Sequence, residues 1–456
     1  MPPDDTLDPR TSIRLKDPTL LSQRCYIDGR WADAASGATK FVVNPATGAR
    51  IGTAPRMGGA ETRLAIEAAA AAFPAWRAKT AKERSGILRK WFELMLANVD
   101  DLALILTSEQ GKPLAESKGE VTIGAAYVEW FAEEARRVYG DVIPTISNDR
   151  RLVVVKEPVG VCAAITPWNF PSSMITRKVA PALAAGCTVV IKPAEVTPYS
   201  ALALAELAHR AGFPPGVLNV ITGDARAIGG EMCANPTVRK LSFTGSTEIG
   251  RLLMQQVAPT VKKISLELGG NAPFVVFDDA DLDAAAEGAI IAKYRNAGQT
   301  CVCTNRFFVH DRVYDAFAAK LVDRVKALKV GPGTEAGVTQ GPLIDAAGLA
   351  KVEDHIADAT AQGARVATGG RRHALGGTFF EPTVLTDVTA AMKIFREETF
   401  GPVAPLIRFK TDAEVIELAN RTEYGLASYF YSRDIGRIWR VAEALEYGMV
   451  GVNTGL

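Results

Sequence analysis

Short apolar, β-branched runs alternate with longer segments of helical periodicity through the middle of the chain. Runs typical of buried strands occupy 188–192, 216–222 and 238–243, bounded by glycine or proline. An alanine- and leucine-rich stretch at 198–211, which Gly212 terminates, predicts a helix between the first two strands. Strand–helix–strand units with short connections predict a largely parallel sheet covered by helices, which is an α/β fold.

A second series of the same kind follows Glu267. Residues 272–277 predict a strand, and Asp281 is typical of an N-cap before a helix that runs to about Tyr294. Apolar positions at helical spacing between 314 and 328 form one stripe, which indicates a core helix rather than a cofactor site. The change of series predicts a domain boundary directly after Glu267.

Charge and hydropathy exclude several classes of protein. The chain has 52 lysines and arginines against 51 aspartates and glutamates, so no general phosphate-binding surface is expected. The sequence contains no run of about 18 apolar residues, so no membrane-spanning helix is predicted. The N-terminal residues mix acidic and basic side chains without an apolar core, which is not typical of a secretory signal. We expect a cytoplasmic protein with neither nucleic-acid nor membrane partners.

The cysteines and histidines do not show metal-ligand or disulfide-scaffold spacing. There is no Cys-x-x-Cys, and the four histidines are scattered. We therefore expect no metal site. The six cysteines are Cys25, Cys162, Cys187, Cys233, Cys301 and Cys303.

Cys301 is the first candidate for chemistry. It follows a predicted helix and is flanked by small and polar residues, which favours a loop position. A cysteine thiolate is a strong nucleophile where the surroundings favour ionisation or a base removes the proton. The alternative is a buried structural cysteine, the commoner environment for an intracellular thiol.

Glu267 is the second candidate, because it is a single carboxylate between apolar residues just before Gly269-Gly270. Burial would raise the pKa of its carboxyl toward the range of a general base. The alternative is a glutamate that faces solvent or pairs with Lys262 or Lys263.

Two strand ends carry residues suited to a nucleotide. Ligands of open α/β sheets bind beyond the carboxyl ends of the strands, where Lys192 and Glu195 could hold a ribose. A surface ion pair is the alternative for these two. Gly245 and Ser246 form a strand-to-helix turn that suits a phosphate, although such turns are often purely structural and no Gly-x-Gly-x-x-Gly is present.

Six motifs together resemble those of the aldehyde dehydrogenase superfamily in order and spacing, over about Tyr26 to Leu456. They are Thr166-Pro-Trp-Asn-Phe-Pro171, Lys192-Pro-Ala-Glu195, Phe243-Thr-Gly-Ser-Thr247, Leu266-Glu-Leu-Gly-Gly270, Gly298-Gln-Thr-Cys301 and Glu397-Glu-Thr-Phe-Gly-Pro402. The resemblance implies that Cys301 attacks an aldehyde, giving a thiohemiacetal and then a thioester. Asn169 and the Cys301 N–H would hold the oxyanion, and Glu267 would activate the hydrolytic water.

The resemblance also implies a nicotinamide cofactor in a Rossmann-like domain. Glu398 would hold the nicotinamide ribose, and Leu268 would lie beside the nicotinamide. A carboxylate at Glu195 favours NAD, whereas Lys192 leaves room for NADP. The cofactor-binding positions are Thr166, Pro167, Trp168, Asn169, Lys192, Pro193, Ala194, Glu195, Gly245, Ser246, Leu268 and Glu398.

Within the superfamily the chain is most similar to succinate-semialdehyde dehydrogenases. Arg177 and Arg295 match the arginines that bind the substrate carboxylate there, and a guanidinium pairs bidentately with a carboxylate. Two solvated arginines are the alternative. Alternative substrates are glutarate semialdehyde or a broader range of aliphatic aldehydes. A catalytically silent cofactor-binding or structural protein is a third reading, against which Asn169, Glu267 and Cys301 argue.

Cys303 stands two residues from the candidate nucleophile. Two close thiols can form a reversible disulfide, so oxidation could join Cys301 to Cys303 and stop the reaction. The alternative is a small loop side chain without a redox role.

The resemblance implies a domain plan and a homo-oligomer, either a dimer or a tetramer. Residues 1–135 and 153–267 would form the NAD-binding domain, 136–152 an oligomerisation hairpin, and 268–456 the catalytic domain. Relatives continue beyond the position of Leu456 with a substrate-contacting loop and an oligomerisation strand, for which this sequence has no counterpart.

Overall fold

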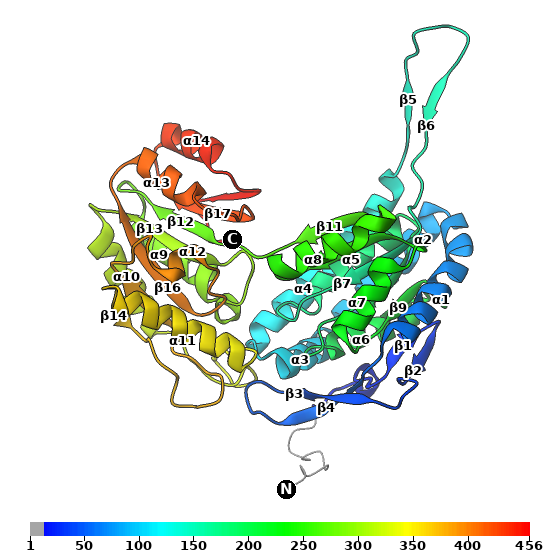
Figure 1. Cartoon of the computed structure of the whole chain (residues 1–456), viewed down its shortest axis with the longest axis horizontal. Coiled ribbons are helices and arrows are strands. Elements are labelled where there is room, and N and C mark those ends of the chain that lie inside the picture. Colours follow the sequence, from blue (N-terminus) through cyan, green and yellow to red (C-terminus); the bar gives the residue numbers. More distant parts are fainter. Residues whose placement is uncertain (1–12) are drawn as a thin grey trace. The chain divides into compact units, whose positions relative to one another are not determined.

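The computed structural model describes residues 13–456 and confirms the α/β class. The chain divides into two compact units (Figure 1). Unit 1 contains the described residues up to Asn44, Ala49–Gln110 and Ser117–Glu267, and unit 2 contains Pro45–Gly48, Gly111–Glu116 and Leu268–Leu456. The two short segments of unit 2 lie within the range that the sequence analysis gave to the first domain. Most of the N-terminal stretch, whose composition is not typical of a secretory signal, lies outside the described residues.

The main sheet of unit 1 has seven strands in the order β11-β10-β7-β8-β9-β1-β2. The first five run parallel, whereas β1 pairs antiparallel with both β9 and β2. Every residue of β8 is buried, as expected of a parallel strand covered on both faces. The strands are β1 (Cys25–Ile27), β2 (Arg30–Ala32), β7 (Val161–Ile165), β8 (Thr188–Lys192), β9 (Leu218–Val220), β10 (Val238–Thr244) and β11 (Lys263–Glu267).

Helices cover the unit 1 sheet, and α6 begins one residue later than the predicted 198. The core that they enclose contains Trp76, Trp91 and Tyr199. The helices are α1 (Gly59–Ala78), α2 (Ala81–Ala97), α3 (Val99–Gln110), α4 (Leu114–Glu134), α5 (Ser173–Ala184), α6 (Tyr199–Ala211), α7 (Ala225–Ala234) and α8 (Thr247–Val257), with short 3-10 turns η2 (Pro18–Leu20), η3 (Ala135–Arg137) and η4 (Ala258–Thr260).

Two separate hairpins belong to this part of the chain. The strands β3 (Thr39–Val43) and β4 (Arg50–Pro55) pair antiparallel. The insertion expected at 136–152 is the hairpin of β5 (Asp141–Ile143) and β6 (Leu152–Val154), which extends away from the rest of unit 1 (Figure 1). Its strand residues are exposed, so no described residue covers them.

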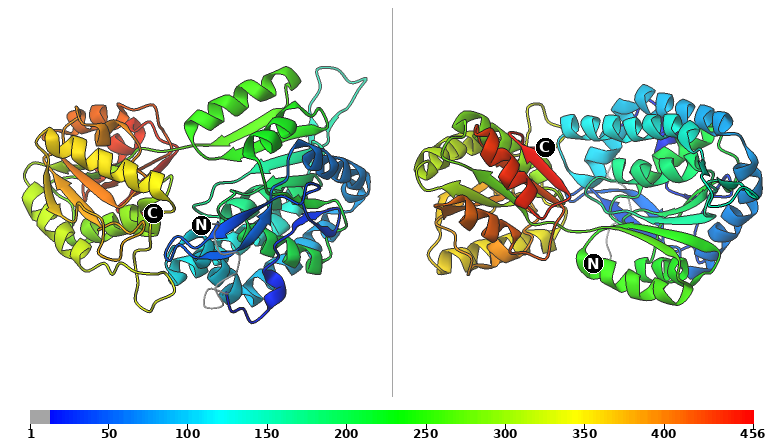
Figure 2. Two further views of the ribbon diagram at one scale, coloured as in Figure 1. Left: turned by 60° about the horizontal axis from the view of Figure 1, so that its bottom comes forward. Right: turned by 90° about the horizontal axis from the view of Figure 1, so that it is seen from above.

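Unit 2 is built on a second seven-stranded sheet, in the order β14-β15-β16-β13-β12-β17-β18, with helices on its faces (Figure 2). Only β14 is antiparallel to its neighbour. The strands are β12 (Ala272–Val276), β13 (Thr304–His310), β14 (Arg365–Thr368), β15 (Thr383–Thr386), β16 (Val403–Phe409), β17 (Ala427–Tyr431) and β18 (Met449–Val452).

The helices of unit 2 confirm two local predictions. Asp281 caps α9 by accepting hydrogen bonds from the N–H groups of Asp283 and Ala284. The apolar stripe of α10 is buried, as expected. The helices are α9 (Leu282–Tyr294), α10 (Tyr314–Lys326), α11 (Ala346–Ala361), α12 (Lys393–Arg396), α13 (Asp412–Asn420) and α14 (Ile435–Ala444), with the 3-10 turn η5 (Arg295–Gly298).

Residues 13–456 contain neither a candidate membrane span nor a candidate metal cluster. No helix in this range is both long enough and apolar enough to span a membrane. Nor does this range contain a group of three or more histidines, cysteines or acidic residues placed to hold a metal ion.

Candidate active site

The candidate residues of unit 1 gather at one edge of its sheet. Thr166 follows β7, Lys192 ends β8, Gly245 follows β10 and Glu267 ends β11. Because these strands are parallel, their carboxyl ends share an edge, which is where ligands of such sheets bind. Backbone hydrogen bonds join them: the Thr166 N–H donates to the Lys192 carbonyl at 3.1 Å, and the Gly245 N–H donates to the Glu267 carbonyl at 3.0 Å.

Lys192 and Glu195 do not pair with each other. The buried Lys192 ammonium donates to the Pro193 carbonyl at 3.1 Å, and burial lowers its pKa, with Glu195 opposing that shift. The Glu195 carboxylate instead pairs with Lys40 at 2.7 Å and accepts the Ala225 N–H at 3.2 Å. Both candidate residues therefore lie at the carboxyl end of β8, and the partner of Glu195 comes from β3.

This edge fits the polar groups of a nucleotide. The buried hydroxyls of Thr166 and Thr244 have no hydrogen-bond partner within the described part of the chain. Ser246 caps α8 by accepting the Ile249 N–H at 3.4 Å, so a helix N-terminus faces the same edge. Buried donors left without protein acceptors are expected where a ligand supplies them.

The loop between β7 and α5 holds the next group of predicted residues, Pro167, Trp168 and Asn169. Asn169 is buried, whereas Trp168 is half-buried. Ser172 and Ser173, at the end of the loop, donate their N–H groups to the buried Glu120 carboxylate at 2.9 and 3.2 Å. This contact fixes the point at which α5 begins.

Glu267 is only partly buried, so of the two alternatives that the sequence left open, the structure favours a carboxylate that reaches solvent over one enclosed by apolar residues. About 40% of its side chain is exposed, and its Oε1 lies 3.7 Å from a guanidinium nitrogen of Arg177. The proposed pairing with Lys262 is wrong, because that ammonium donates to the carbonyls of Met232 and Asn235. The sequence missed Arg177 as the partner since it lies ninety residues earlier, on α5.

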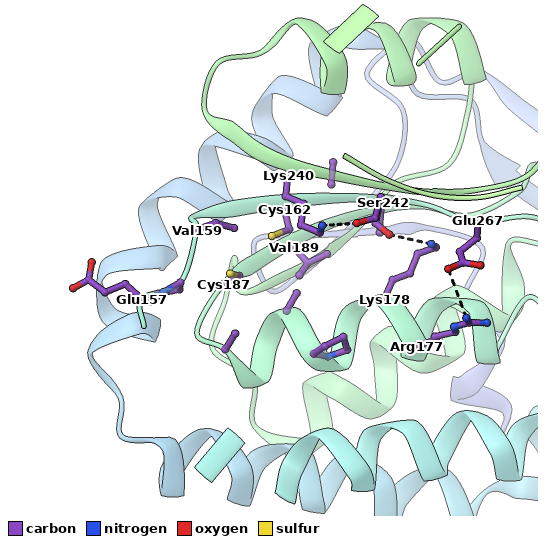
Figure 3. A pocket seen from close by; sticks show the side chains of 17 residues that line it. Glu157, Val159, Cys162, Arg177, Lys178, Cys187, Val189, Lys240, Ser242 and Glu267 are labelled. Atoms are coloured by element: carbon purple, nitrogen blue, oxygen red, sulfur yellow. Dashed lines mark hydrogen bonds and ion pairs between the residues drawn. The ribbon is translucent and has the colours of Figure 1, made fainter. Parts of the chain in front are cut away.

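Arg177 and Glu267 lie at one end of a cavity of about 350 Å³ between α5 and the sheet (Figure 3). Lys178 also lines it and donates to the Ser242 hydroxyl at 3.0 Å. Burial lowers the pKa of Lys178 to about 8, and the nearby Glu267 carboxylate opposes this shift. Sequence reasoning gave Lys178 no role, although it stands next to the singled-out Arg177.

In unit 2, Cys301 lies in the loop between η5 and β13 and is partly buried. Two glycines allow the surrounding chain to pack closely. A Cβ at Gly270 would lie 2.2 Å from the Cys301 carbonyl oxygen. Gly298 has a φ of +76°, and a Cβ there would lie 2.1 Å from the Gly401 carbonyl. The loop that carries Cys301, the candidate nucleophile, is therefore held by backbone contacts that a larger residue would prevent.

Glu398 contacts the same glycine pair. Its Oε1 accepts the Gly270 N–H at 3.0 Å, and burial raises the pKa of its carboxyl to about 7. Thus Gly270 contacts both Cys301 and Glu398, and the structure brings together these two predicted residues of unit 2. Leu268, which directly follows Glu267, begins the long C-terminal segment of the same unit and is half-buried.

Arg295 and Cys303, together with Thr300 and Tyr429, line a narrow pocket beside the loop that carries Cys301. The buried Cys303 thiol donates to the Lys293 carbonyl at 3.1 Å, and burial raises its pKa. The pKa of the fully buried Lys293 ammonium is lowered, again by burial. No sequence pattern indicated a buried Lys293, because a lysine at such a position on a helix is typically solvated.

Comparisons with known proteins agree with this fold. The family model "Aldehyde dehydrogenase family" matches residues 31–456. A glutarate-semialdehyde dehydrogenase of Pseudomonas aeruginosa is 65% identical over 444 residues, 97% of this chain and 92% of that protein. A succinate-semialdehyde dehydrogenase [NADP(+)] of Escherichia coli is 62% identical over the same shares of the two chains. The crystal structure of a succinate-semialdehyde dehydrogenase from Burkholderia pseudomallei superimposes with a TM-score of 0.96 at 68% identity, covering 97% of this chain and 92% of that one.

The match over nearly the whole chain defines the class of protein. The chain belongs to the aldehyde dehydrogenase family and has its fold, as the sequence motifs predicted. Enzymes of this family that resemble the chain use NAD or NADP.

Proposed function

We propose that the chain oxidises succinate semialdehyde to succinate, with NAD as the preferred cofactor and NADP as a second one. The Cys301 thiolate attacks the aldehyde carbon, and the Asn169 amide and the Cys301 N–H stabilise the oxyanion of the thiohemiacetal. A bound nicotinamide nucleotide supplies the acceptor for the hydride. Glu267 then removes a proton from the water that hydrolyses the thioester, which releases the carboxylate product and the free thiol.

The proposed cofactor contacts fall into two groups. Lys192, Glu195, Gly245 and Ser246 would bind the adenosine and phosphate part, which the unsatisfied hydroxyls at that edge of the sheet support. Glu398 would accept hydrogen bonds from the nicotinamide ribose. Its carboxyl already accepts the Gly270 N–H through one oxygen, so its orientation is fixed.

One observation carries the substrate assignment: the Arg177 guanidinium lies at 3.7 Å from Glu267 in the same cavity. A carboxylate-binding cation beside the candidate base suits an aldehyde that carries a second acidic group. Arg295, close to the nucleophile loop in sequence, is the second proposed contact for that group. Glutarate semialdehyde is the second candidate, because the compared relatives are divided between the two substrates.

Initial rates with succinate semialdehyde, glutarate semialdehyde and butanal, each with NAD and with NADP, test this proposal. We expect kcat/KM to favour the succinate compound by about tenfold, since one methylene changes binding by roughly 1–3 kcal/mol. Replacing Arg177 or Arg295 with alanine should raise KM for the semialdehydes at least about tenfold and leave KM for butanal nearly unchanged. Arg63→Ala, which removes an exposed arginine that pairs with Glu231 at 2.9 Å, is the matched control. Equal losses on charged and uncharged aldehydes would contradict the proposal.

We also propose that the chain forms a homo-oligomer through the β5–β6 hairpin. Its strands expose large apolar residues, including Val142, which is 75% exposed, and Val153, which is 66% exposed. Such surfaces are usual at subunit interfaces. Light scattering of the protein and of a Val142→Lys variant tests this. A parent that is monomeric at micromolar concentration would contradict it.

A further inference from the structure

The ion pair between Lys40 and Glu195 has no part in the reaction as proposed. Lys40 comes from β3, and Glu195 from the loop after β8. The ammonium lies 2.7 Å from Oε2, and Oε1 accepts the Ala225 N–H at 3.2 Å. Both oxygens of Glu195 are therefore engaged. The two side chains are 49% and 30% exposed, so a ligand can reach the pair.

The position of this pair matters for nucleotide recognition. Glu195 stands at the edge of the sheet where the proposed function places the adenine ribose. A carboxylate at that position accepts a hydrogen bond from a ribose 2′-hydroxyl and repels a 2′-phosphate. A lysine ammonium on the same carboxylate cancels much of that repulsion and can itself donate to a phosphate oxygen.

The charges around this edge are nearly balanced, so a single lysine decides whether the local net charge is positive or zero. Lys192 and Lys40 are the two ammonium groups, and Asp224 adds a second carboxylate near Lys192. Arg56 lies 3.6 Å from Asp224. These five side chains sum to one positive charge, and they would sum to zero without Lys40. A 2′-phosphate carries about −1.5 to −2 charges at neutral pH, so it responds strongly to this difference.

We propose that Lys40 is a specificity-determining residue of the cofactor site, which lets the chain accept the 2′-phosphate of NADP although Glu195 favours NAD. The proposal rests on the proposed cofactor site. Lys40 neutralises the Glu195 carboxylate and offers an ammonium to the phosphate. NAD, which lacks the phosphate, gains little from Lys40.

Isothermal titration calorimetry of the full chain with NAD and with NADP, in the absence of aldehyde, tests the proposal by binding rather than by turnover. For Lys40→Gln we expect the Kd for NADP to rise about tenfold, equal to about 1.4 kcal/mol, and the Kd for NAD to change less than about threefold. Lys40→Arg should retain the parent's ratio of the two constants. Glu195→Gln should lower the Kd for NADP, because it frees the Lys40 ammonium.

Lys16→Gln is the matched control, because it removes another exposed lysine that pairs with a carboxylate, Asp100, at 2.9 Å. It should leave both constants unchanged. Equal weakening of NAD and NADP by Lys40→Gln would overturn the proposal and leave the cofactor site in place. A parent that binds NAD but not NADP would also overturn the role of Lys40 and leave the cofactor site in place. A parent that binds neither nucleotide would overturn the proposed cofactor site together with the role of Lys40.

Discussion

Replacing Gly270 with alanine tests how firmly the loop that carries Cys301 is held. An ideal Cβ at position 270 would lie 2.2 Å from the Cys301 carbonyl oxygen, whereas ordinary contacts begin near 3.4 Å. The neighbouring atom belongs to the backbone and cannot rotate away. One of the two segments must therefore move by about 1 Å, and overpacking of this kind typically costs roughly 1–3 kcal/mol.

We expect Gly270→Ala to lower the free energy of unfolding by about that amount and to reduce kcat about a hundredfold, because a nucleophile displaced by about 1 Å loses its alignment. Urea denaturation and initial rates with a saturating semialdehyde measure the two effects. Gly348→Ala in α11 is the control. Its Cβ would come no closer than 3.6 Å to another group, and alanine favours the helix by about 1 kcal/mol. A Gly270→Ala variant with the parent's urea midpoint and kcat would refute the packing argument.

Three further predictions concern buried groups. Burial raises the pKa of Glu398 to about 7, so the folded state binds a proton that the unfolded chain releases near pH 4.5. Between those pH values the free energy of unfolding of the parent should therefore fall as pH rises, by at most on the order of 3 kcal/mol relative to Glu398→Gln. Urea midpoints of the two proteins that change in parallel from pH 5 to 8 would contradict this. Glu109→Ala should destabilise the fold by about 1–3 kcal/mol in urea, because the N–H groups of Tyr199 and Ser200 lose their buried acceptor. Glu109→Gln, which keeps one acceptor for the N-terminus of α6, should lower the free energy of unfolding clearly less. Equal losses of stability in the two variants would contradict the role of Glu109 as the acceptor at this helix end. Peroxide should inactivate both the parent and Cys303→Ala, and dithiothreitol should restore the activity of the parent but not that of the variant. Identical recovery of both proteins would exclude a disulfide between Cys301 and Cys303.

Local pattern predicted those elements whose signal is contained in a few consecutive residues. The strand at 188–192 is bounded by glycine and proline, and its bounds are correct. The N-cap at Asp281 depends on one side chain and the nearby N–H groups of Asp283 and Ala284, and this prediction too is correct. The hairpin of β1 and β2 was not predicted, because its three-residue strands are stabilised by pairing with β9, nearly two hundred residues away.

Motifs could identify candidate residues of the site but could not identify their partners. The sequence left open whether the Glu267 carboxylate is buried or reaches solvent, and it did not indicate Arg177 of α5 as its partner. Glu195 meets Lys40, which lies 155 residues earlier. Motif spacing does not reveal contacts between residues that are so far apart in the sequence, because such contacts depend on the order of the strands in the sheet.

The same dependence on tertiary contacts separates the two neighbouring cysteines. Cys303 is buried, its thiol donates to the Lys293 carbonyl, and burial raises its pKa, so little thiolate forms at neutral pH. Cys301, two residues earlier, is partly exposed, and its backbone is fixed against Gly270. A nucleophile must be both accessible and fixed in position, and of these two thiols Cys301 combines the two properties. Burial therefore favours the same assignment of the nucleophile that the sequence motif implies, on independent grounds.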